Sequence, residues 1–166
     1  MADVGPPLWG CALHATIGKT CCQGTEVLVT AGDRARISAA IGRDDWYELR
    51  SVDDPAYFGQ DDDPNWTRWG FLPDGTRPVV KHRDNRDCTF LGPQGCSLAT
   101  EVRPLVCRLF PYEYTERGFT GLSAMCPGHV IPPGRAILDL IGLRRPDAER
   151  WHTMLYDELR SGRHVP

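Results

Sequence analysis

The spacing of the cysteines is the feature of this chain that most limits what it can fold into. In the second half of the chain, 7, 10 and 18 residues separate the successive cysteines Cys88, Cys96, Cys107 and Cys126, and an adjacent pair, Cys21 and Cys22, lies near the N-terminus. Cysteines grouped in this way, in a chain with no secretion signal, hold a metal more often than they form disulfides. The odd total of seven cysteines also disfavours a fully paired disulfide framework. The spacing therefore predicts a cysteine-rich metal centre.

Thiolates suit such a centre because sulfur is soft and, once deprotonated, anionic. Four thiolates complete a tetrahedral zinc site or hold an iron–sulfur cluster. The chain lacks the two close Cys-x-x-Cys pairs of a zinc ribbon, and Cys126 is followed by proline as in a ferredoxin cluster motif, although the other spacings differ. Cys21 and Cys22 reach one metal together only from a sharp turn, because neighbouring side chains of extended backbone point in opposite directions.

The residues around these cysteines resemble a known family. The segment DCTFLGPQGCSLATEVRPLVCRLFPYEY, with TCCQGTEVLVTAGDRARI before it and MCPG after it, is similar to the YkgJ-type cysteine-cluster family, also described as the CxxCxxCC zinc- or iron-chelating domain. Flagellin lysine N-methylase carries a version of this module. The resemblance implies a set of metal ligands, namely Cys21, Cys22, Cys88, Cys96, Cys107 and Cys126. Because these exceed the four ligands that one zinc needs, an iron–sulfur cluster or iron with a redox or enzymatic role is favoured over zinc.

Two alternatives stay open beside that reading. The first is a zinc-stabilised structural or interaction module, and the second is an enzyme related to lysine methylation. A full CxxCxxCC motif would place cysteines where Ala15 and Gly18 stand, and Cys11 and His14 are nearby candidates to replace them. The chain has no Gly-rich strand-to-helix turn for S-adenosylmethionine, so we expect that it does not methylate protein by itself.

Composition limits the partners and the compartment. Hydrophobic residues make up 41% of the chain and charged residues 25%, which is typical of a soluble globular domain. The net charge of −3 disfavours a nucleic-acid partner, because phosphate binding requires a basic face. No apolar stretch approaches the roughly 20 residues that cross a bilayer, so we expect no membrane partner. The expected location is the cytoplasm, and the expected partner is a protein or small molecule that the sequence does not identify.

The pattern along the chain predicts a small, irregular α+β domain with short hairpins and three or four helices around the metal centre. We expect an N-terminal arm at 1–20, a cysteine-cluster domain at 21–130 and a helical extension at 131–166. The expected elements are a strand over Thr25–Val29, a helix from Thr30 to Gly42, a helix over Asp44–Arg50, a loop over 51–67, a hairpin joining 69–72 to 78–82, a tight turn at 92–95, a helix after Pro104, a hairpin around Arg117-Gly118, and helices beginning at Pro133 and Pro146.

Several polar residues near the cysteines have two readings. Arg103 and Arg108 flank Cys107, where they would neutralise a cluster's charge or grip an anionic substrate. Salt bridges to Glu101 or Glu113 explain these arginines equally well. His129, three residues after Cys126, is the histidine best placed to assist a metal.

Overall fold

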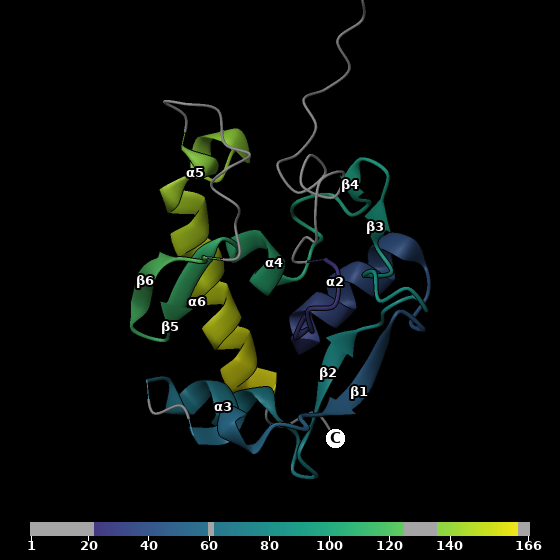
Figure 1. Ribbon diagram of the computed structural model, residues 1–166, viewed down its shortest axis with the longest axis vertical. Helices are drawn as coiled ribbons and strands as arrows, with labels where there is room; N and C mark the ends of the chain where they lie inside the picture. Colours follow the sequence, from purple (N-terminus) through teal and green to yellow (C-terminus); the bar gives the residue numbers. More distant parts are fainter. Residues whose placement is uncertain (1–21, 60–61, 125–135, 163–166) are drawn as a thin grey trace, which may run out of the picture.

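The computed structural model describes residues 22–59, 62–124 and 136–162. The described part of the chain is a small α+β domain with five α-helices and short antiparallel strand pairs (Figure 1). The α+β prediction is confirmed, and the expected three or four helices were too few. The arm at 1–20 lies outside the described residues, as do Cys11, His14, Cys21, Cys126 and His129. Among the described helices, none has the length and apolar character needed to cross a bilayer.

Helix α2 (Ala31–Ile41) forms as its sequence predicts. The Thr30 side chain accepts a hydrogen bond from the Asp33 backbone N–H, and the Asp33 carboxylate accepts one from the Thr30 N–H, which completes a capping box. At the other end Gly42 adopts a left-handed conformation with φ of 72°, which glycine reaches without steric cost. Both ends of the helix are therefore fixed by local chemistry.

The segment before α2 connects two hydrophobic cores. Val27 and Val29 pack into a first core with Ile37 and Trp46, whereas Leu28 packs into a second core. This alternation follows from extended backbone, in which successive side chains face opposite ways. The segment pairs with its neighbour through an isolated bridge between Leu28 and Val79, so the expected strand over Thr25–Val29 is reduced to bridge contacts.

The first antiparallel pair corrects two predictions. Strand β1 (Tyr47–Ser51) pairs with β2 (Thr76–Val80) in a register that sets Tyr47 opposite Val80. The helix expected over Asp44–Arg50 is therefore wrong. The hairpin expected between 69–72 and 78–82 is also wrong, because β1 is the partner of β2. Both elements form because β1 pairs with a strand far along the chain, and no local sequence pattern predicts such a distant partner.

Between these strands lie the 3₁₀-helix η1 (Pro55–Gly59) and α3 (Pro64–Gly70). The Asp63 side chain accepts a hydrogen bond from the Trp66 N–H, and Pro64 occupies the first turn. An acidic N-cap followed by proline is a helix-start signal. The loop expected over 51–67 is therefore wrong where η1 and the start of α3 lie.

The cysteine-bearing elements follow the predictions more closely. Strands β3 (Leu91–Gly92) and β4 (Gly95–Cys96) form the expected tight turn. Helix α4 (Leu105–Leu109) begins after Pro104, carries Cys107 and ends before Pro111. Strands β5 (Tyr112–Thr115) and β6 (Gly118–Leu122) make the expected hairpin.

Helix α6 (Arg145–Ser161) organises the second core. It has Pro146 in its first turn, as expected, and buries Trp151, Leu155 and Leu159. The preceding helix α5 (Ile137–Leu140) is shorter than the predicted helix, whose start at Pro133 lies outside the described residues. Figure 1 shows α6 beside α4 and the β5–β6 hairpin, with α2 and the β1–β2 pair on the other side of α4.

Candidate functional site: a thiol cluster

The four described cysteines gather around the first core. Cys88 belongs to it, being only 8% exposed, and Cys22, Cys96 and Cys107 are half-buried and pack against it. They come from separate parts of the fold, namely the segment before α2, the turn before β3, strand β4 and helix α4. In the part of the chain that the structure describes, all four therefore lie in or against the first core.

Cys22 and Cys88 have the closest relation that backbone pairing gives. An antiparallel bridge joins Gln23 to Asp87, so the residues on either side of this bridge face each other. The Cys88 N–H donates to the Cys22 carbonyl at 2.7 Å, and the Gly24 N–H donates to the Arg86 carbonyl at 2.9 Å. Cys22 therefore lies opposite Cys88, joined to it by one backbone hydrogen bond, and residues opposite each other in an antiparallel pair carry their side chains on one face.

The expectation of a metal-binding protein is wrong for the described residues. Within 22–59, 62–124 and 136–162, no group of three or more His, Cys, Asp or Glu side chains is arranged to hold a metal ion. The cysteines pack against apolar side chains such as Phe90 and Leu98, so they share a region without forming a coordination site. The zinc-stabilised module fails on the same finding, and nothing supports a lysine-modifying enzyme. Cys21 and Cys126, the other expected ligands, lie outside the described residues.

Burial disfavours the loss of the proton from Cys88, Cys96 and Cys107. Burial raises the pKa of Cys88 to about 12, and the charge of a Cys22 thiolate adds to this rise. Burial also raises the pKa of Cys96, and it raises that of Cys107 well above the ordinary value, again with a contribution from Cys22. A charge on Cys22 thus acts on all three of the other thiols.

Hydrogen-bond donors and positive charges near individual sulfurs lower the pKa values that burial raises. Backbone N–H groups two residues further along donate to the thiols, from Phe90 to Cys88 and from Leu98 to Cys96, and they lower the two pKa values. The positive charge of Arg83 acts in the same direction on Cys88. The Arg103 side chain hydrogen-bonds to Cys96 and is held by the Leu98 carbonyl, to which its Nε donates at 3.0 Å.

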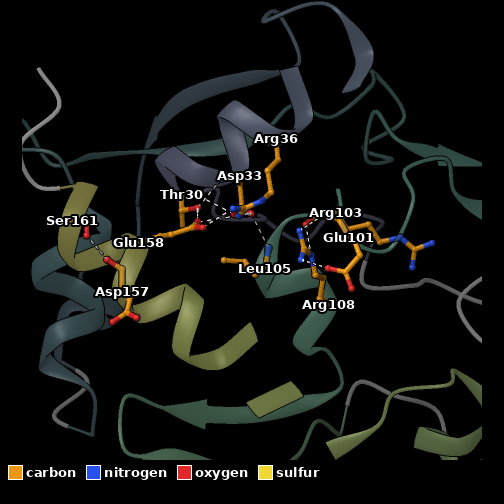
Figure 2. A network of polar contacts seen from close by, with 10 residues as sticks. All are labelled: Thr30, Asp33, Arg36, Glu101, Arg103, Leu105, Arg108, Asp157, Glu158 and Ser161. Carbon is orange, nitrogen blue, oxygen red and sulfur yellow. Dashed lines mark hydrogen bonds and ion pairs between the residues drawn. The ribbon is translucent and has the colours of Figure 1, made fainter. Parts of the chain in front are cut away.

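A buried carboxylate fixes the helix that carries Cys107. Asp33 is fully buried, and its Oδ1 accepts a hydrogen bond of 3.1 Å from the Leu105 N–H at the start of α4 (Figure 2). The same oxygen accepts one of 2.7 Å from Arg36 Nη2. Burial raises the pKa of Asp33, and the hydrogen bonds from Thr30 and Arg36 lower it, with the net change upward. The α2 capping box therefore also joins α2 to α4.

Glu158 extends this contact to α6. Its carboxylate accepts hydrogen bonds from Arg36 Nη1 at 2.5 Å and Nη2 at 3.0 Å, and a further one from the Thr30 hydroxyl. Gly32 makes this approach possible, because a Cβ at Gly32 would overlap the Glu158 carboxylate. We refer to Thr30, Asp33, Arg36 and Glu158 as the polar clamp (Figure 2).

The loop before α4 is held by Arg108, which is 4% exposed. Its Nε donates to the Arg103 carbonyl at 2.8 Å, and its Nη1 lies 3.3 Å from Glu101 Oε2. The salt bridge to Glu101 that was one of two readings of Arg108 is therefore present. The role of Arg108 is to close the loop that delivers Cys107, and Figure 2 shows it beside Glu101 and Arg103.

Sequence reasoning missed the polar clamp beyond the capping box itself. Arg36 and Glu158 are 122 residues apart in the chain, and no local pattern relates them. A cue existed only at Gly32, because a glycine inside the first helical turn costs stability and usually has a packing reason.

Comparison with family models, with curated proteins and with solved structures finds no match to this chain. The resemblance to the cysteine-cluster family therefore stays a prediction, and the function has to be argued from the site.

Proposed function

We propose that this chain is a thiol–disulfide redox protein in which Cys22 and Cys88 form a reversible disulfide. The observation that carries the proposal is the antiparallel pairing that sets these two residues directly opposite each other. Residues opposite each other in an antiparallel pair have Cα atoms about 4.5 to 5.5 Å apart. That separation lies within the range of about 4.4 to 6.8 Å over which disulfides form.

Exposure assigns different roles to the two thiols. Cys22 is half-buried, whereas Cys88 is buried in the first core. Cys22 is therefore the thiol that an external disulfide reaches first, and Cys88 completes the bond from the protected side. Cys96 and Cys107 pack against the same core but are not paired with Cys22 through the backbone. They therefore take no part in the first thiol–disulfide exchange.

The reaction balances as a thiol–disulfide exchange. The Cys22 sulfur, having lost its proton to solvent, attacks one sulfur of a small-molecule disulfide and releases the other half as a thiolate. The Cys88 sulfur then loses its proton and attacks the Cys22 sulfur of the mixed disulfide, releasing the second half. The small disulfide gains two electrons and the protein pair loses two, so the small disulfide is the oxidant.

The test treats the purified full-length chain with hydroxyethyl disulfide, blocks the remaining thiols and maps the new bond by mass spectrometry. Fragmentation of the linked peptide is needed, because Pro104 protects Arg103 from trypsin and leaves Cys88, Cys96 and Cys107 on one peptide. We expect a Cys22–Cys88 bond, which both Cys22→Ala and Cys88→Ala abolish. Cys96→Ala is the matched control and retains the bond.

Two results would overturn the proposal. The first is a chain that keeps its thiols under these conditions or links Cys22 to a different cysteine, including the adjacent Cys21. The second is stoichiometric zinc or iron in the isolated chain that protects Cys22 and Cys88 until a chelator removes it. Metal analysis before and after chelation therefore accompanies the mapping.

A further inference from the structure

We infer, on the basis of the proposed function, that the disulfide exchanging with Cys22 is anionic and carries carboxylates, as oxidised glutathione does. The inference rests on guanidinium groups that lie near the thiol cluster, two of them in the turn before Cys88. They belong to Arg83, Arg86 and Arg103.

Arg86 lies against the backbone next to Cys22. A Cβ placed on Gly24, two residues after Cys22, would lie 3.9 Å from both Nε and Nη2 of Arg86. The Arg86 backbone is held there, because its carbonyl accepts from the Gly24 N–H at 2.9 Å and its N–H donates to the Arg83 carbonyl at 2.8 Å. An exposed cation thus lies against Gly24, close along the chain to the thiol that reacts first.

Arg83 approaches from the Cys88 side. Its Nη2 donates to the Thr89 carbonyl at 3.0 Å and to the Leu91 carbonyl at 2.7 Å. Neutral carbonyls position this guanidinium without cancelling its charge. Among the described residues no carboxylate lies within ion-pair distance of Arg83 or Arg86.

Two carboxylates in the same turn reduce the positive charge without abolishing it. Asp87 accepts hydrogen bonds from the Gln23 side-chain amide at 3.1 Å and from the Asn85 amide at 2.9 Å. Asp84 is exposed. The charges of Arg83 and Arg103 act on the Cys88 and Cys96 thiols, and Arg86 lies against Gly24. Three guanidinium groups near the thiols thus stand against the two acids of this turn, and such a surface raises the local concentration of anions.

The test compares initial rates of Cys22–Cys88 bond formation with oxidised glutathione, neutral hydroxyethyl disulfide and cationic cystamine. The variants are Arg86→Gln alone and Arg83→Gln with Arg86→Gln. Because an exposed charge pair contributes up to about 1 kcal/mol, we expect the rate ratio of glutathione to hydroxyethyl disulfide to fall about fivefold in the double variant and less in the single one. The neutral reagent should react with all chains at the same rate.

Arg117→Gln is the matched control, because Arg117 is an exposed arginine in the turn between β5 and β6. It should leave the ratio unchanged, and high salt should remove the difference between the wild type and the double variant. A ratio that the arginine variants do not alter, or a preference for cystamine, would overturn the anionic-substrate inference while leaving the proposed function intact. A pair that hydroxyethyl disulfide fails to join would instead remove the proposed function itself.

Discussion

Replacing Gly32 with alanine should destabilise this protein, although alanine is the better helix former. Alanine gains about 1 kcal/mol over glycine within a helix. Its Cβ, however, would overlap the Glu158 carboxylate and push it away from Arg36 and Thr30. Hydrogen bonds to charged groups contribute about 1.5 to 3 kcal/mol each, and these side chains are partly exposed, so the displaced contacts together represent about 3 kcal/mol. The expected net loss is about 2 kcal/mol.

Thermal and urea unfolding, followed by circular dichroism, measure this loss. For a chain of this size a loss of about 2 kcal/mol lowers the Tm by about 4 to 8 °C. In a Glu158→Ala background the obstacle is gone, so Gly32→Ala should then stabilise by about 1 kcal/mol. The sign reversal gives a coupling energy of about 3 kcal/mol in a double-mutant cycle. A Gly32→Ala chain as stable as the wild type, or an equal penalty in both backgrounds, would refute the reasoning on the polar clamp.

Three further predictions concern the same helix. Asp33→Ala leaves the Leu105 and Thr30 N–H groups without their acceptor and should cost about 3 kcal/mol in urea unfolding; a loss below 1 kcal/mol would contradict the role assigned to Asp33. Burial raises the folded-state pKa of Asp33 above its ordinary value of 3.8. As the pH rises from 3.8 through the folded-state pKa, the free energy of unfolding of the wild type should therefore fall relative to that of Asp33→Asn. The opposite trend in unfolding measured against pH would mean that hydrogen bonding to the carboxylate outweighs its burial. Gly42→Ala places a Cβ at a φ of 72° and should cost about 1 kcal/mol, whereas Gly59→Ala, with open space around it, is the control and should change the Tm little.

Elements with strong local signals were predictable from the sequence. The capping box at Thr30 and the left-handed Gly42 determine α2 within a few residues of chain, and Pro104 and Pro146 mark the starts of α4 and α6. These signals act through hydrogen bonds and backbone restrictions next to the residue that carries them. They therefore appear in the sequence without knowledge of the rest of the fold.

Elements that depend on distant partners were not predictable in this way. The segment after Gly42 becomes a strand because Tyr47 pairs with Val80, and Trp46 is buried against Phe90. The four described cysteines lie in or against the first core, yet the cysteine spacing gave no information on whether their side chains converge. Coordination depends on side-chain geometry, and a linear spacing does not determine it.

The central claim, that Cys22 and Cys88 are a redox pair, is tested most directly by a redox titration of the full-length chain. The chain is equilibrated in buffers of varied ratio of reduced to oxidised glutathione, its free thiols are blocked, and the state of each cysteine is read by mass spectrometry. The account predicts one two-electron transition in which Cys22 and Cys88 disappear from the free-thiol pool together while Cys96 and Cys107 stay reduced. Loss of Cys22 without Cys88, or no loss of either thiol across the whole range, would contradict it.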